Sequence, residues 1–98
     1  MTQLEKDIEA KLRKLVESRG GLCLKWVCPG WVGVPDRIVL LPGGRVIFVE
    51  TKRPKGGRLI PMQVWWQKKL TRLGFQHDII WNKEDLMDFE IWVLEAAL

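Results

Sequence analysis

The apolar patterns of this 98-residue chain predict an α/β fold of the α+β kind, a mixed four-stranded sheet flanked by helices. Three observations carry the prediction: an amphipathic helical stretch opens the chain, three short strand-like runs follow, and a helix, a strand and a last helix close it. The length suits one domain, residues 1–98. Apolar residues form 47% of the chain and charged residues 29%, which favours a folded domain over a disordered one.

Helical spacing of apolar residues, ended by two glycines, predicts the first helix. The apolar positions are Leu4, Ile8, Leu12, Leu15 and Val16, and the glycines are Gly20 and Gly21. Runs of branched and aromatic residues predict strands at Leu22–Val27, Arg37–Leu41 and Val46–Lys52. Only a Pro-Gly-Gly sequence separates the second strand from the third, so these two should form an antiparallel hairpin.

A second helix should begin at Pro61, which fits a first helical turn, and end at Gly74. Its expected buried stripe is Met62, Trp66, Leu70 and Leu73, and its outer face carries Trp65, Lys68, Lys69 and Arg72. Phe75–Trp81 is the predicted fourth strand. Asn82, three residues before Asp85, has the pattern of a cap for a third helix.

That last helix is apolar on more than one side. Its apolar residues are Leu86, Met87, Phe89, Ile91, Trp92, Val93, Leu94 and Leu98. A chain this small has little of its own to cover such a helix, so we expect a second copy to cover it in a symmetric homodimer. The alternative is a monomer that docks this helix on a partner protein.

The net charge of +4 and the pI near 9.3 favour a polyanionic partner. Residues 45–72 concentrate the positive charge, with eight bases and one acid, and are the expected contact for a phosphate backbone; the alternative is a solvated basic loop. The chain has no apolar run long enough for a membrane span and no secretory signal at its start, so we expect a cytoplasmic protein without a membrane partner. Cys23 and Cys28 lack a second ligand pair for zinc, and His77 is expected to play an ordinary surface or core role.

Chemistry is predicted where the third strand ends. Glu50 and Lys52 are two apart on a strand and therefore share a face. Asp36 begins the second strand, and the hairpin places it at the same end. Magnesium prefers such oxygen ligands, although an E-x-K triplet alone is equally compatible with a plain salt bridge.

The string GVPDRIVLLPGGRVIFVETK, with these three residues in order, resembles the VRR-NUC (virus-type replication-repair nuclease) family of the PD-(D/E)xK superfamily. The resemblance implies a restriction-endonuclease-like αβββαβ core with an additional C-terminal helix, one nuclease domain over residues 1–98. It implies that Asp36, Glu50 and the carbonyl of Thr51 bind the metal, that Lys52 positions the attacking water, and that Gln63 lies near the active centre. Gln63 is otherwise an ordinary surface amide.

The family also uses an acid on the first helix. Glu9 is our choice and Glu5 the second candidate, although either could equally be a solvated helix flank. Trp31, Trp65 and Trp66 are bulkier than the motif requires. Buried packing or a subunit contact is favoured for Trp66, and stacking on nucleic acid stays open for Trp65.

These residues together predict a Mg²⁺-dependent DNA endonuclease, with Mn²⁺ as a substitute and no small-molecule substrate. The expected DNA-binding residues are Arg53, Lys55, Arg58, Trp65, Lys68, Lys69 and Arg72. A symmetric homodimer would suit a four-way (Holliday) junction, which is the expected substrate, and the resemblance implies a setting in phage or bacterial replication and repair. The alternatives are a flap or nicking nuclease, a catalytically idle DNA-binding module or subunit of a larger nuclease complex, and a sequence-specific restriction enzyme.

Overall fold

The computed structural model describes residues 3–53 and 56–95, and in it four strands form one sheet in the order β1-β2-β3-β4. The strands are β1 (Leu22–Lys25), β2 (Arg37–Leu41), β3 (Arg45–Thr51) and β4 (Gln76–Ile80). The first three pair antiparallel and β4 pairs parallel with β3. The mixed four-stranded sheet predicted from the sequence is therefore confirmed.

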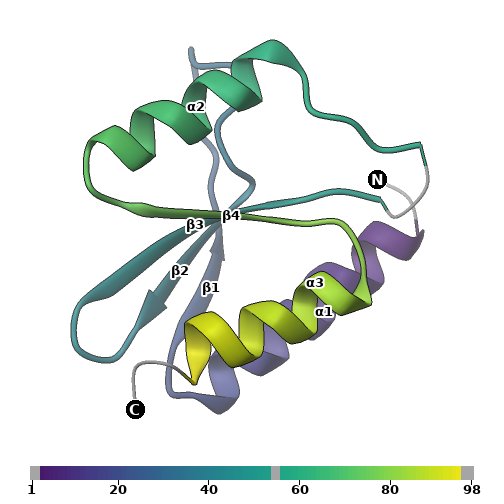
Figure 1. Ribbon diagram of the computed structural model, residues 1–98, viewed down its shortest axis with the longest axis vertical. Coiled ribbons are helices and arrows are strands. Elements are labelled where there is room, and N and C mark those ends of the chain that lie inside the picture. The colour runs from purple at the N-terminus through teal and green to yellow at the C-terminus, as the bar shows by residue number, and fades with distance from the viewer. Residues whose placement is uncertain (1–2, 54–55, 96–98) are drawn as a thin grey trace.

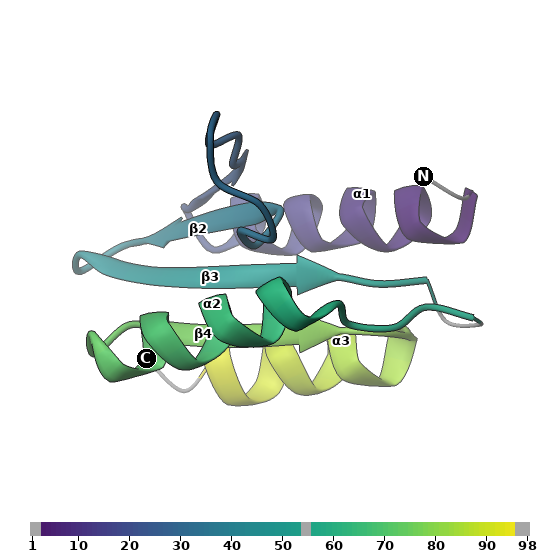
Figure 2. The ribbon, with the colours of Figure 1, turned by 90° about the horizontal axis from the view of Figure 1, so that it is seen from above.

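Helices cover both faces of this sheet. α1 (Gln3–Ser18) and α3 (Lys83–Phe89) lie on one face, and α2 (Pro61–Arg72) lies on the other (Figure 1). α1 packs on β1 and β3, while α3 lies beneath β4 in the view from above (Figure 2). The α2 crossover explains why β4 is parallel to β3, since a parallel connection has to return across the sheet.

The turns follow the chemistry that the sequence predicts. Gly43 and Gly44 close the β2–β3 hairpin with φ of 83° and 75°, a left-handed conformation that costs glycine little. The Asn82 side chain accepts the backbone N–H of Asp85 at 2.8 Å, so the predicted cap of α3 is present.

The hydrophobic core lies between the sheet and the α1/α3 layer. Leu12, Val16, Val39 and Phe89 are at most 1% exposed there. Burying each such side chain contributes roughly 1.5–3 kcal/mol to the stability of the fold. The face under α2 is covered by one helix only.

The prediction of a buried stripe on α2 is wrong for the first and the last residue of that stripe. Leu70 is buried and Trp66 half-buried, but Met62 is 37% and Leu73 58% exposed. Leu73 follows the last helical residue, where the chain leaves α2 and turns at Gly74 toward β4. Met62 packs on the loop before β2 instead of the sheet, since a Cβ on Gly33 would lie 2.6 Å from the Met62 Cβ.

The last helix buries one stripe and exposes another. Its final turn is a π-helix, η1 (Glu90–Leu94). Leu86, Phe89, Val93 and Leu94 are buried, whereas Met87, Ile91 and Trp92 are 60%, 47% and 72% exposed. Leu98, also part of the predicted apolar set, lies outside the described residues. No described helix is long and apolar enough to cross a membrane.

Candidate active site

The hairpin register brings two acids to one end of the sheet. Arg37 at the start of β2 pairs with Val49 on β3, so Asp36 just before and Glu50 just after lie at the same edge. The backbone carbonyl of Asp36 also accepts the Trp26 N–H at 2.9 Å, which continues the β1–β2 pairing beyond the strand ends. Two carboxylates on adjacent strand ends are thus held by backbone pairing.

Thr51 fixes the orientation of Asp36. Its backbone N–H donates to both carboxylate oxygens of Asp36, at 3.2 Å and 3.4 Å, and its hydroxyl oxygen lies 2.6 Å from Asp36 Oδ2. The same hydroxyl lies 3.1 Å from Oε1 of Glu9 on α1. A hydroxyl has one proton, so it can serve only one of these two acceptors at a time. The carboxylates of Asp36 and Glu9 therefore share one hydroxyl donor.

Glu50 accepts a hydrogen bond from the Asp36 backbone and is contacted by the side chains of Gln63 and Lys52. Gln63 Nε2 donates to Glu50 Oε1 at 3.1 Å, while Gln63 Oε1 accepts the Ile60 backbone N–H at 3.0 Å and so anchors the amide in the first turn of α2. Lys52 Nζ lies 3.9 Å from Glu50 Oε1, with both side chains largely buried. Gln63 is therefore tied to the acid and is not a solvated surface amide.

Burial raises the pKa of both acids. Desolvation raises the pKa of Asp36 to about 6, despite the two Thr51 hydrogen bonds, which lower it. Desolvation and then the nearby Asp36 charge raise the pKa of Glu50 to about 8, although Lys52 lowers it. Two raised carboxyl pKa values side by side mark a place where an added cation would be strongly stabilised.

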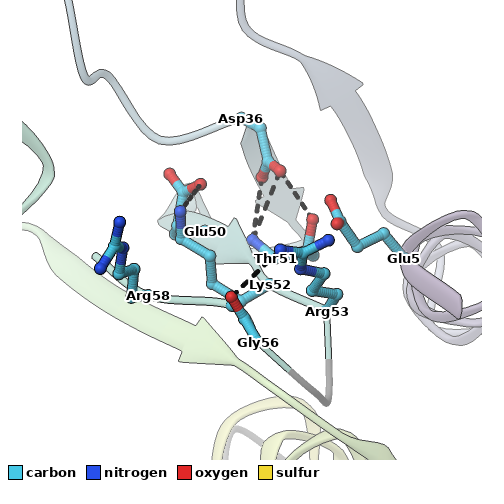
Figure 3. A pocket seen from close by; sticks show the side chains of 9 residues that line it. Glu5, Asp36, Glu50, Thr51, Lys52, Arg53, Gly56 and Arg58 are labelled. Atoms are coloured by element: carbon cyan, nitrogen blue, oxygen red, sulfur yellow. Dashed lines mark hydrogen bonds and ion pairs between the residues drawn. The ribbon is translucent and has the colours of Figure 1, made fainter. Parts of the chain in front are cut away.

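These groups line a pocket of about 300 Å³. Figure 3 shows Asp36, Glu50 and Lys52 at the strand ends, with Glu5 reaching in from α1 on one side and Arg58 on the other. Arg53 also lines the pocket, and its Nη2 donates to the carbonyl of Gly56 at 3.2 Å. The pocket thus has an acidic floor and basic side chains around it.

A divalent ion fits this donor set. Within residues 3–53 and 56–95, no three His, Cys, Asp or Glu side chains form a metal-holding group by themselves. Magnesium commonly uses only one or two carboxylates and completes its shell with waters and substrate phosphate oxygens. Asp36 and Glu50, which lie side by side at the strand ends and are raised in pKa, are such a pair.

The two candidate acids of α1 differ in where they point. Glu5 lines the pocket, whereas Glu9 is buried and bridges Thr51 and Arg37. Arg37 Nη2 lies 3.0 Å from Glu9 Oε2, with side chains 17% and 9% exposed. The roles of Arg37 and of the Thr51 hydroxyl are not predicted from the sequence; the position of Arg37 directly after Asp36 is the one signal that points to them.

The predicted DNA-binding residues fall into two groups. Arg53 and Arg58 lie at the pocket, while an exposed ridge on α2 consists of Trp65, Lys68, Lys69 and Arg72. The ridge lies on the face of α2 opposite Gln63, and Arg72 at its far end lies about 14 Å from Gln63 along the helix axis. Lys55 lies outside the described residues.

Tryptophans link α2 to the loop before β2. Trp66 donates its indole N–H to the Val32 carbonyl at 2.9 Å and makes edge-to-face contacts with Trp26, Trp31 and Trp65. Trp66 therefore packs within the molecule, which is one of the two roles expected for it. Trp31 and Trp65 remain 57% and 44% exposed.

Comparison with known proteins identifies the family. No family model matches the chain. The chain is 42% identical over 83 residues to "Putative nuclease p44" of Acyrthosiphon pisum secondary endosymbiont phage 1, covering 85% of this chain and 83% of that protein. Its structure is similar to that of a solved VRR_NUC domain, with a TM-score of 0.84, 24% identity, and coverage of 90% of this chain and 95% of the other. The chain therefore belongs to the same family as this phage protein, and its fold is that of a VRR_NUC domain.

Proposed function

We propose that this protein is a metal-dependent DNA endonuclease that hydrolyses phosphodiester bonds. The observation that carries the proposal is the meeting of Asp36, Glu50 and Lys52 in one pocket with basic side chains around it. The related phage protein is named as a nuclease, which supports the same reaction class.

The side chains of the pocket have different roles, which follow from their positions. Asp36 and Glu50, with the Thr51 carbonyl, would hold Mg²⁺ or Mn²⁺, which would polarise the phosphate and stabilise the leaving oxygen. Lys52, close to Glu50, orients the attacking water. Gln63 keeps the Glu50 carboxylate in place, and Thr51 does the same for Asp36.

Basic side chains position the substrate. Arg53 and Arg58 are at the pocket, where they hold the phosphate that is cut. The α2 ridge extends the positive charge away from the pocket, where it holds the backbone beyond the cut. Trp65 at the start of the ridge offers a stacking surface for a base that has left the duplex.

The substrate that we propose is branched DNA, with a four-way junction first, cut by a symmetric homodimer. One active centre cuts one strand, so two centres related by a twofold axis suit two symmetric cuts. The exposed apolar side chains Met87, Ile91 and Trp92 are the surface that a second copy would cover. The proposed setting is the cytoplasm of a bacterial or phage-infected cell, since the relative is a phage protein.

A panel of DNA structures tests this proposal. The purified protein is incubated with single-stranded, duplex, flap and four-way-junction DNA, with Mg²⁺ or with excess chelator, and its mass is measured by sedimentation. We expect a dimer that cuts the junction fastest and is inactive in chelator. A monomer that cuts flap or plain duplex DNA as fast as the junction would favour the flap or nicking alternative, and absence of any cleavage would favour a DNA-binding subunit.

A further inference from the structure

A second groove lies on the other side of Glu9 from the active-site pocket. Its volume is about 170 Å³, and it is lined by one face of α1 together with the first residue of β2. We call it the α1 groove; it consists of Lys6, Glu9, Ala10, Arg13 and Arg37. It shares no lining residue with the active-site pocket, although Arg37 directly follows the pocket acid Asp36.

The charge of the groove is positive. Three of its side chains are bases and one is an acid, and that acid is already bound to Thr51 and Arg37. Lys6 makes no ion pair among the described residues, and Arg13 has only a loose contact at 3.9 Å with Glu17, both more than half exposed. Two long cationic side chains on the same helix face are thus available to an incoming anion.

Arg37 has donor capacity beyond its ion pair. Its Nη2 donates to Glu9, but its buried Nε–H has no acceptor within the part of the chain that the structure describes. A buried donor without a partner costs stability and is uncommon in folded proteins. Arginine presents its donors as a planar fork that matches phosphate oxygens, and the Arg37 side chain lines the groove, so an anion bound there would lie against its guanidinium.

We propose that the α1 groove binds a backbone phosphate of the DNA next to the one that is cut. This inference rests on the proposed nuclease function and assigns Lys6, Arg13 and Arg37 a role in holding substrate. The groove and the pocket meet at the Glu9 bridge, so a strand lying in the groove leads into the active centre. DNA would then be held on both sides of the cut, by α1 on one side and by α2 on the other.

The opposite face of the same helix provides a matched control. Lys11 and Lys14 belong to α1 but line a different surface hollow, beside Leu86. The variants Lys6→Ala/Arg13→Ala and Lys11→Ala/Lys14→Ala therefore remove the same charge from the same helix, on different sides. Thermal unfolding of both establishes that the fold is kept.

Binding to a short fluorescein-labelled junction is measured with Ca²⁺ in place of Mg²⁺, as a function of salt. We expect Lys6→Ala/Arg13→Ala to lose about tenfold in affinity and to lower the slope of log K against log salt by about 1, the value for one lost phosphate contact. The control pair should change affinity by less than about twofold. Equal losses in the two variants, or none in the first, would overturn the proposal.

A second readout locates the phosphate. Single methylphosphonates, which are neutral, replace each phosphate near the cut in turn. One position should weaken binding by the wild type and the control pair but not further by Lys6→Ala/Arg13→Ala, because the contact is already lost. Additive losses at every position would contradict the groove as a phosphate site. If the wild type neither binds nor cuts DNA, the proposed function itself fails, which is a different result.

Discussion

Thr51 holds Asp36 with two donors, a backbone N–H at 3.2 Å from Oδ1 and a hydroxyl at 2.6 Å from Oδ2. The threonine is the last residue of β3 and the aspartate directly precedes β2, so the contact closes the hairpin at the active-site end. It fixes the carboxylate before any ligand arrives, which lowers the reorganisation that binding or catalysis would require.

Replacing Thr51 by Val should therefore disturb Asp36. The substitution removes a hydrogen bond that lowers the pKa of Asp36, so that pKa should rise further in the metal-free protein, and cleavage should slow by about tenfold. Carboxyl-carbon NMR titration measures the pKa and a gel assay the rate. Thr51→Ser should restore both values. Thr71→Val removes an exposed hydroxyl bonded to Gln67 on α2 and should change neither; an unaltered Asp36 pKa in Thr51→Val would contradict the assignment.

The metal-free protein should lose stability as the pH rises. Asp36 and Glu50 have folded-state pKa values of about 6 and about 8, above their ordinary values of 3.8 and 4.5. Between these ordinary and raised values the folded state binds more protons than the unfolded state, so raising the pH favours unfolding. In chelator, we expect Tm to fall by several degrees between about pH 5 and about pH 8.5.

Two further measurements test whether Asp36 and Glu50 cause the fall in Tm. Glu50→Gln cannot lose a proton, so most of the pH dependence should disappear in this variant. Mg²⁺ added at the upper pH should restore the Tm of the wild type, because an ion that binds only the folded state stabilises it. A Tm that rises over the same pH range, or that falls equally in Glu50→Gln, would refute the role of these acids.

The α2 ridge should bind the DNA backbone. The triple variant Lys68→Ala/Lys69→Ala/Arg72→Ala should bind DNA more weakly than the wild type. It should also lower the slope of log K against log salt by about 2 to 3, because each phosphate contact that is lost reduces the number of counterions released on binding. Lys11→Ala/Lys14→Ala/Lys83→Ala removes as many exposed charges from the α1/α3 side and is the control. An unchanged slope in the ridge variant would place the DNA on another face.

Trp65→Ala, measured in the same binding assay and by sedimentation, decides between the two roles of that side chain. Lost affinity with the mass unchanged indicates stacking on a base, whereas a lower mass indicates a subunit contact.

The exposed stripe of the last helix should form the dimer contact. Trp92→Glu places a charge in an apolar interface and should give a monomer by sedimentation at micromolar concentration. Val27→Glu is the control, because Val27 is also 72% exposed but lies in the loop after β1. If Trp92→Glu stays as large as the wild type while Val27→Glu dissociates, the interface lies on the other side of the molecule.

The sequence predicts the elements well because each has a local signature. Hydrophobic spacing, Pro61 at a helix start and the glycines of the hairpin all act within a few residues. It fails for Met62 and Leu73, because helical periodicity does not reveal how much of a sheet face one helix covers.

The acids of the site were likewise predictable, whereas the contacts that orient them were not. Asp36, Glu50 and Lys52 sit at strand ends that the sequence marks. Arg37 with Glu9, and Glu9 with Thr51, join residues 28 and 42 positions apart, and only the folded sheet sets those distances. The periodicity of α1 alone likewise could not separate Glu5 at the pocket from Glu9 beneath it.

The central claim is that Asp36, Glu50 and Lys52 carry metal-dependent cleavage, and single-turnover cleavage with Mg²⁺ by Asp36→Asn, Glu50→Gln and Lys52→Met tests it most directly. We expect each variant to fold, as judged by circular dichroism, and to cut at least about a thousandfold more slowly than the wild type, because each removes a group that acts on the phosphate or the water. The wild type should be inactive in chelator. A folded variant that cuts at nearly the wild-type rate, or a wild type fully active in chelator, would contradict the account.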